Sequence, residues 1–274
     1  MRVTMATSPA KPGQPNEDFT AATPNAAVLL DGAGLAGTTS RCRHGVAWYT
    51  RRLGGTLLTS LAGDEDHDLA TILADAIGQT AAAHADTCDL DDPGTPSATV
   101  VMLRHRGDTL EYLVLADSVL VLDRAGGTPV VVTDDRGERL GKQYRSTVDG
   151  LANGTPEHDE ALRDFVQTMR AYRNRPGGFW VAAADPQAVN EAITASLPVE
   201  DVTAVAMLSD GASRLVDHFE LTDWPGLLAI LRDDGPAELI RHVRAAEASD
   251  PRAGRWPRGK TYDDATAAYC TDLT

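Results

Sequence analysis

Two apolar runs of this sequence end in an Asp-Gly pair, and this repeated pattern constrains the fold most. Residues 202–208 lead through Ser209 into Asp210-Gly211, and residues 26–30 lead into Asp31-Gly32. Such a run predicts a buried strand, and Asp-Gly is a strong turn signal. A carboxylate at the end of a buried strand is held rigidly at an open edge, which suits metal binding or acid–base chemistry. Two such turns far apart in the sequence predict one shared site.

The rest of the chain alternates between the periods of strands and helices. Strand patterns occur at 1–7, 97–103, 110–116, 119–122, 129–133, 179–183 and 265–269. Helical spacing occurs at 40–62, 66–84, 157–172, 186–195, 224–232 and 236–247. Short turns between consecutive strands predict antiparallel pairing. Residues 134–156 are polar and rich in Gly and Asp, so we expect a surface loop or flap there. With no repeat or linker, residues 1–274 are predicted to form a single domain.

The charge and aromatic content exclude several classes of partner. The chain has 25 Lys and Arg against 40 Asp and Glu, a net charge of −15, which disfavours nucleic acid and anionic membranes. Aromatic residues make up only 5%, which argues against a base-stacking surface. The first residues lack the apolar core of a signal peptide, and no run reaches the length of a membrane span. We therefore expect a cytoplasmic protein, monomeric, with no nucleic-acid or membrane partner.

The cysteines and histidines show no ligand spacing. Cys42, Cys88 and Cys270 are far apart and form no CxxC pair, which argues against a disulfide framework or a structural zinc site and fits a reducing cytoplasm. The histidines share no motif, and we expect surface residues rather than ligands: His44, His67, His84, His105, His158, His218 and His242.

Six acidic residues stand at predicted strand ends or turns: Glu17, Asp18, Asp31, Asp117, Asp210 and Asp263. Converging carboxylates repel one another unless they are protonated or share cations. Oxygen ligands select hard ions such as magnesium or manganese, and two such ions about 4 Å apart activate a water and clamp a phosphoryl group. Turn capping is the alternative for each residue, because Asp commonly precedes Gly in turns.

The order and context of these acids carry a family resemblance. The segments NEDF, VLLDGAG, GTPSATVV, VLADSVLVLD, LSDGASRLVD and YDDATAAY extend in that order from Asn16 to Tyr269. Together they resemble the motifs of the metal-dependent protein phosphatases, the type 2C or PPM family. The resemblance implies an α+β fold, a four-layer αββα sandwich of two antiparallel sheets flanked by helices, with a dinuclear metal centre at one end.

The same resemblance implies the site and its chemistry. Two Mn²⁺ or Mg²⁺ ions would be held by Asp18, Asp31, the Gly32 carbonyl, Asp210 and Asp263, with Glu17 contributing through water. Asp117 and Asp210 would hold a third, weaker ion. Phosphoserine or phosphothreonine of a phosphorylated protein would be hydrolysed by a metal-bridging water, without a covalent intermediate, as part of signalling.

Three positions depart from the family pattern. Ala33 stands where many eukaryotic members have a histidine that acts as an acid, although bacterial members often lack it. Gly13 stands where many members have a phosphate-binding arginine, and Lys11 or Gln14 would have to substitute. Ala116 replaces the glycine of a Gly-Asp-Ser motif, which is a minor change unless the backbone there needs a positive φ.

These departures leave a second function open, a pseudophosphatase that acts as a regulatory binding module. A third interpretation is a phosphatase for a small phosphorylated metabolite. The basic stretch of Arg252, Arg255, Arg258 and Lys260 either docks a phosphopeptide near Asp263 or is a solvated loop.

Overall fold

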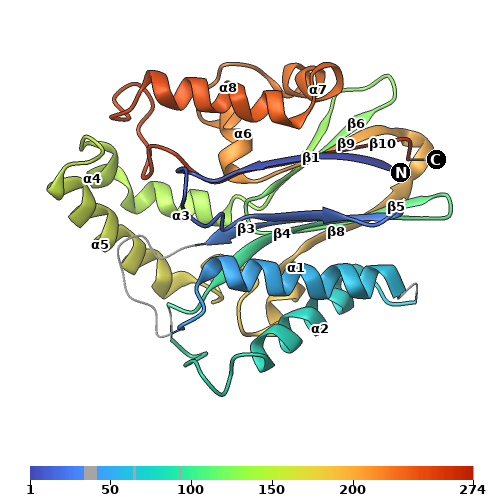
Figure 1. Ribbon diagram of the computed structural model, residues 1–274, viewed down its shortest axis with the longest axis horizontal. Helices are drawn as coiled ribbons and strands as arrows, with labels where there is room; N and C mark the ends of the chain where they lie inside the picture. The colour runs from blue at the N-terminus through green and yellow to red at the C-terminus, as the bar shows by residue number, and fades with distance from the viewer. Residues whose placement is uncertain (34–41, 64–65, 93, 274) are drawn as a thin grey trace.

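Two five-stranded antiparallel sheets form the centre of the molecule (Figure 1). The computed structural model describes residues 1–33, 42–63, 66–92 and 94–273. Sheet A has the strand order β1 (Arg2–Ser8), β10 (Ala265–Thr271), β9 (Val202–Leu208), β6 (Val119–Arg124), β7 (Val130–Val132). Sheet B has the order β2 (Phe19–Ala22), β3 (Ala26–Ala33), β4 (Ser97–Arg106), β5 (Thr109–Leu115), β8 (Ile193–Pro198).

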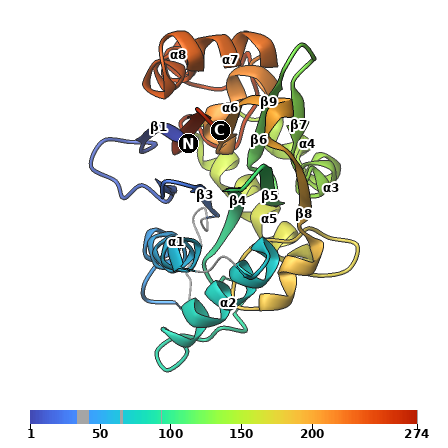
Figure 2. The same ribbon diagram turned by 90° about the vertical axis from the view of Figure 1, so that its right-hand side faces the viewer.

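Helices cover the outer face of each sheet, as Figures 1 and 2 show from two directions. Sheet B is covered by α1 (Val46–Gly63) and α2 (Leu69–Ala82). Sheet A is covered by α6 (Asp210–Asp217), α7 (Trp224–Asp233) and α8 (Pro236–Ser249). Three further helices, α3 (Arg136–Tyr144), α4 (Ser146–Asp149) and α5 (Pro156–Tyr172), lie at the end of the sandwich away from both termini. Two short 3₁₀ segments, η1 (Pro186–Glu191) and η2 (Val199–Asp201), precede β8 and β9.

Three apolar layers hold the four structural layers together. Alternate residues of one strand point to opposite faces, so Val28 of β3 packs toward α1 and α2 while Leu29 packs between the sheets. In β9, Val205 and Met207 face the other sheet, and Ala206 faces the helices over sheet A. Strands buried on both faces need apolar residues at every position, which explains the uninterrupted runs of the sequence. The predicted αββα sandwich is confirmed.

The prediction of a loop at 134–156 is wrong, because this segment contains α3 and α4. Its polar, glycine-containing composition did not indicate α3, in which Gly141 lies against Phe165 and ion pairs lie on the exposed side. Arg139 pairs with Asp135 and Lys142 with Glu138, both at i,i+4 spacing.

Two further predictions fail between residues 179 and 198. The apolar run 179–183 forms only isolated bridges, because the Asn174 side chain makes hydrogen bonds to both the N–H and the C=O of Val181 in place of a neighbouring strand. The predicted helix at 186–195 is η1 followed by the edge strand β8, which pairs with β5. The strand is largely exposed, although Ile193, Ala195 and Leu197 alternate with polar residues as in a strand with one covered face.

Two histidines are buried rather than on the surface. His84 follows α2 and His158 lies in the first turn of α5, and their exposed fractions are 1% and 2%. No helix among the described residues combines the length and the apolar character that a bilayer span requires.

Candidate metal centre

The strand topology brings four acidic segments to one end of the sandwich. Phe19 pairs with Leu30, so Asp18, which precedes β2, lies beside Asp31 near the end of β3. In sheet A, Ala267 pairs with Leu208, so the start of β10 and its preceding Asp263 lie beside the end of β9. Asp210 begins α6 directly after β9. Asp117 lies just before β6 (Val119–Arg124), whose Val119 pairs with Leu208, and so joins these four segments. We call Asp18, Asp31, Asp117, Asp210 and Asp263 the acidic centre.

Both Asp-Gly pairs need their glycine for close backbone approach. A Cβ on Gly32 would lie 2.5 Å from the carbonyl oxygen of Glu17, and one on Gly211 would overlap the carbonyl oxygen of Asp264. Gly32 therefore lets the end of β3 pack against the backbone of Glu17. Gly211 lets the start of α6 pack against the backbone of Asp264. The turns predicted at the two pairs are wrong, because Asp31 and Gly32 lie within β3 and Asp210 and Gly211 begin α6. The repeated Asp-Gly motif is a packing requirement of this site instead.

Asp264 fixes the segment that carries Glu17 and Asp18, a role that the sequence did not reveal. Its Oδ1 accepts a hydrogen bond from the Ala10 N–H at 2.6 Å, and its Oδ2 accepts one from the Glu17 N–H at 2.8 Å. The Asn16 side chain accepts a bond from the Asp18 N–H at 2.9 Å. The pair Asp263-Asp264 in the YDDATAAY segment could have indicated this role. Asp263 faces the acidic centre, and Asp264 binds the N-terminal segment to it.

A direct contact joins the two sheets at the acidic centre. The Asp210 N–H donates a hydrogen bond to Oδ2 of Asp31 at 3.1 Å, which links the start of α6 on sheet A to β3 on sheet B. The N-terminus of a helix favours a nearby negative charge, since its free N–H groups point outward. The link therefore holds the carboxylate-bearing end of β3 and the start of α6 at a fixed separation.

The carboxylates of this centre resist ionisation in the protein alone. Burial raises the pKa of Asp18 to about 7, the charges of Asp210 and Asp264 add to the rise, and the nearby hydroxyls of Thr266 and Ser209 offset only part of it. Burial and the charge of Asp18 hold the pKa of Asp31 well above its usual range.

The same effect reaches the mouth of the centre, where Asp117 and Asp210 keep exposed surface. Desolvation by the surrounding protein and the charge of Asp263 raise the pKa of Asp210. Desolvation and the charge of Asp210 raise the pKa of Asp117 to about 7. Burial also raises the pKa of Glu17.

Asp263 is the exception, because two cations contact it. Burial alone would raise its pKa, but Lys260 and Arg214 outweigh burial and lower it. The Lys260 Nζ lies 2.8 Å from Oδ1, and an Arg214 Nη lies 3.1 Å from Oδ2. Arg214 is itself fixed by the fully buried Glu247 at 2.8 Å, which also binds Arg244. Arg214 and Glu247 were missed in the sequence because both lie inside helical patterns that explain them equally well as surface residues.

This donor set fits hard divalent cations. The Asp18 side chain is among the most enclosed of the acidic centre. Both of its carboxylate oxygens are buried and accept no hydrogen bond within the described residues. Such orphaned acceptors are costly unless a cation or a proton satisfies them. Oδ2 of Asp263 accepts one hydrogen bond and keeps a further lone pair for a cation, whereas Oδ1 accepts two, from the Lys260 ammonium and from the Asp264 N–H.

The predicted phosphate ligands Lys11 and Gln14 lie beside the centre but not in it. Both are exposed, and they flank a turn in which the Gln14 N–H donates to the Lys11 carbonyl at 3.2 Å. Gly13, at the position of the family's arginine, has φ +81° in this turn. The turn joins the centre through Ala10, whose N–H binds Asp264.

Ala116 is a larger departure than the sequence suggested. Its φ is +70°, in the left-handed region that glycine adopts freely. A non-glycine residue there costs about 1–2 kcal/mol. The strained residue directly precedes Asp117, and its carbonyl accepts a hydrogen bond from the Asp134 N–H at 3.1 Å.

Comparisons with known proteins agree with this architecture. The family model described as Protein phosphatase 2C matches residues 6–241. A search of curated protein sequences found no match. Among solved structures, the catalytic domain of the serine/threonine protein phosphatase PstP in complex with two manganese ions is similar at 20% identity, with 98% of this chain and 96% of that chain covered and a TM-score of 0.59.

Two further solved structures share the fold. The serine/threonine phosphatase Stp1 from Staphylococcus aureus is 14% identical, with 98% and 94% of the two chains covered and a TM-score of 0.61. The PPM Ser-Thr phosphatase MsPP from Mycobacterium smegmatis, in complex with cacodylate, is 15% identical, with 98% and 97% covered and a TM-score of 0.55. The family model spans most of the chain, and the protein therefore belongs to the protein phosphatase 2C family.

Proposed function

We propose that the protein is a Mn²⁺- or Mg²⁺-dependent phosphatase of phosphoserine and phosphothreonine in proteins. The observation that carries the proposal is the buried Asp18 carboxylate, which has no hydrogen-bond partner among the described residues and lies among acids with raised pKa values. Family membership supports the same reaction class. We expect a cytoplasmic monomer that acts on phosphorylated protein substrates.

In this proposal the acidic centre holds two divalent cations. Asp18, Asp31, Asp210 and Asp263 supply carboxylate oxygens, the Gly32 carbonyl adds one ligand, and Glu17 acts through water. Asp117, beside Asp210, would hold a third and weaker ion. When bound, the cations supply positive charge that activates a water for attack on phosphorus and neutralises the phosphate oxygens.

The remaining groups of the chain position these ligands. Asp264 anchors the backbone of Glu17 and so orients Asp18. Arg214, held by Glu247, keeps Asp263 ionised and fixed. With Ala33 where many members have an acid, the leaving alkoxide takes its proton from solvent water.

Lys260 is our candidate for the phosphate ligand that the family's arginine would otherwise supply. Its ammonium contacts Asp263, and the charges of Asp263, Asp210 and Asp31 raise its pKa, so it stays protonated at the edge of the acidic centre. Lys gives a point charge rather than a two-pronged contact, so phosphate affinity should be modest. Lys11 and Gln14, exposed in the adjoining turn, would contact the substrate further out.

Turnover of p-nitrophenyl phosphate and of a phosphothreonine peptide, with Mn²⁺ or with chelator, tests the proposal. Asp31→Asn should lower kcat/KM on the order of 10²- to 10³-fold, as expected when charge stabilisation in the transition state is lost. Asp164→Asn, an exposed acid of α5, is the matched control and should behave as wild type. Turnover that survives chelator, or that Asp31→Asn leaves unchanged, would exclude this mechanism. Metal binding without turnover of any phosphoester would indicate a pseudophosphatase.

Lys260→Ala separates substrate binding from catalysis. If Lys260 binds phosphate, this variant should raise KM more than it lowers kcat, because the lost contact acts on bound substrate and transition state alike. Lys11→Ala is the comparison for the outer position. An unchanged KM in Lys260→Ala would assign phosphate binding to the cations alone.

A further inference from the structure

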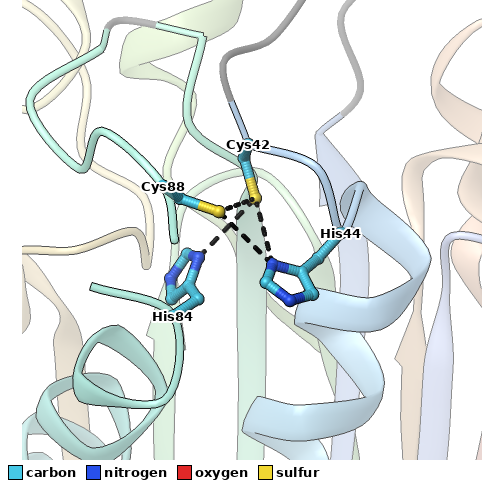
Figure 3. A group of neighbouring side chains, drawn as sticks. All are labelled: Cys42, His44, His84 and Cys88. Atoms are coloured by element: carbon cyan, nitrogen blue, oxygen red, sulfur yellow. Dashed lines mark hydrogen bonds between the residues drawn. The ribbon is translucent and has the colours of Figure 1, made fainter. Parts of the chain in front are cut away.

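Four sulfur and nitrogen ligands meet between the start of α1 and the end of α2, outside the acidic centre. Cys42 and His44 precede α1, and His84 and Cys88 follow α2 (Figure 3). One ligand atom from each, Sγ or a ring nitrogen, lies within 4.8 Å of all the others. We call these four residues the Cys/His cluster.

The spacing of these atoms is that of a tetrahedral metal site. The two sulfurs are 3.4 Å apart, and Nδ1 of His44 lies 3.8 Å from Sγ of Cys42 and 3.3 Å from Sγ of Cys88. Nδ1 of His84 lies 3.6 Å from Sγ of Cys42. With Zn–S about 2.3 Å and Zn–N about 2.0–2.1 Å, a tetrahedron places two sulfurs about 3.8 Å apart and sulfur and nitrogen about 3.6 Å apart.

The backbone presents the ligands in pairs. The Cys88 N–H donates to the His84 carbonyl at 3.0 Å, and the His84 N–H donates to the Ala81 carbonyl at 3.2 Å, so a turn beyond α2 places His84 and Cys88 on one side. His44 stacks on Trp48 in the first turn of α1, with ring centroids 4.3 Å apart. Figure 3 shows the His44 ring directed toward the two sulfurs.

The contacts that the side chains of the Cys/His cluster make with one another are weak ones. Cys42 and His84 are buried, and Nε2 of His84 has no hydrogen-bond partner among the described residues. Thiols are weak donors and weak acceptors, so their contacts offset little of the cost of burial.

We propose that Cys42, His44, His84 and Cys88 bind one zinc ion as a structural site that joins the start of α1 to the end of α2. Two sulfur and two nitrogen ligands in a tetrahedron select zinc rather than the hard ions of an oxygen site. Four protein ligands leave no position for substrate, so the role is structural rather than catalytic. Since α1 follows the strand that carries Asp31, the ion steadies the sheet-B side of the acidic centre.

The sequence argued against a structural zinc site, but the reasons for that argument do not hold in the structure. The argument rested on the missing CxxC pair and on histidines expected at the surface. Here each pair combines one cysteine with one histidine, as Cys42-x-His44 and His84-x₃-Cys88. The two helices between the pairs, not the sequence spacing, bring them together.

Metal content of the full chain, purified under reducing conditions, tests the proposal. Asp31→Asn serves as the background, because it weakens the acidic centre and so removes that source of bound metal. We expect about one zinc per chain in wild type and in Asp31→Asn. Cys42→Ser and Cys88→Ser should lower zinc content at least about tenfold, as removal of a ligand does. Cys270→Ser, a buried cysteine of β10, is the matched control and should keep its zinc.

Cobalt gives a readout that does not depend on the stability of the cysteine variants. Co²⁺ added to zinc-stripped chain should produce thiolate-to-metal charge transfer and the visible bands of a tetrahedral site. His44→Asn changes a half-buried ligand and should weaken those bands while leaving circular dichroism unchanged. Equal zinc in wild type and Cys42→Ser, or no charge-transfer band with Co²⁺, would overturn the proposal. A native mass two hydrogens light under the same reducing conditions would assign the cysteines to a disulfide and would also overturn it.

Discussion

The acidic centre and the Cys/His cluster offer different ligand atoms to a metal ion. The acidic centre offers only oxygen, lies at the junction of both sheets, and keeps Asp117 and Asp210 at an open mouth. The Cys/His cluster offers sulfur and nitrogen and uses all four positions of a tetrahedron. An open oxygen site suits exchangeable ions and a substrate, whereas a closed sulfur site suits a permanent structural ion. The difference predicts which perturbations reach one site and spare the other.

The largest effect we expect is a pH dependence of stability in the metal-stripped protein. Burial raises the folded-state pKa of Asp18 to about 7, above its unfolded value, and the pKa values of Asp31, Asp117 and Asp210 are raised as well. Such groups contribute stability that is fully present below the unfolded pKa and is lost as pH rises through the folded pKa.

Thermal unfolding of the Mn²⁺-free chain should therefore show a lower midpoint at pH 8 than at pH 5, and Mn²⁺ should restore the midpoint at pH 8. Asp18→Asn removes one of the raised groups and should flatten the dependence. A midpoint that rises from pH 5 to pH 8 without Mn²⁺ would contradict the charge state we assign to the acidic centre.

Glu247→Ala should be the most destabilising single substitution near the acidic centre. Glu247 is fully buried and binds Arg214 and Arg244, so its removal leaves two cations without their buried partner. Breaking a buried ion pair costs about 3–5 kcal/mol. Urea unfolding measures the loss. Glu160→Ala, an exposed acid of α5, is the control and should change stability little. Zinc content of folded Glu247→Ala should equal that of wild type, since the Cys/His cluster is elsewhere.

Gly211→Ala tests whether the acidic centre needs the close backbone approach at Gly211. A Cβ there would overlap the Asp264 carbonyl oxygen, so the start of α6 must shift. The free energy of unfolding should fall by about 1–3 kcal/mol, and much of the activity should be lost. Gly55→Ala is the matched control, because a Cβ at this position of α1 meets nothing within 4 Å. It should stabilise the helix by about 0.5–1 kcal/mol. Equal stability of the two variants would contradict the close approach.

Ala116→Gly should give the smallest effect, and with the opposite sign. Ala116 has a positive φ, and relief of that strain outweighs the entropy that glycine loses on folding. We expect a gain of about 0.5–1 kcal/mol in the free energy of unfolding. Ala125→Gly, in the turn after β6 and without a positive φ, is the comparison and should not stabilise. A loss of stability in Ala116→Gly would show that position 116 is not strained.

The sequence predicted the sheets and most acids because their signals are local. Residues 26–30 are apolar at every position and residues 202–208 at every position except the exposed Thr203, as a strand buried on both faces requires. The ordered motifs gave Asp18, Asp31, Asp210 and Asp263 as candidates, and the topology brings all four to one end. The helix α3 was missed because little of it is covered by apolar neighbours, and the edge strand β8 was missed although its sequence alternates apolar and polar residues.

Contacts between distant segments could not be predicted in this way. Arg214 binds Glu247 and Asp263 across 33 and 49 residues, and no local pattern marks that choice. Cys42 and Cys88 are 46 residues apart, and only the packing of α1 beside α2 brings them together. The strain at Ala116 depends on a backbone angle that the substitution alone does not reveal.

Calorimetric titration of the metal-stripped chain with Mn²⁺ tests the central claim most directly, since the acidic centre is proposed to hold divalent cations through Asp18. At pH 7 we predict binding of about two Mn²⁺ per chain, accompanied by proton release from the carboxylates with raised pKa values. Asp18→Asn should weaken this binding about 10- to 100-fold and leave the zinc content of the Cys/His cluster unchanged. Mn²⁺ binding of equal affinity in wild type and Asp18→Asn, or no binding in wild type, would contradict the account.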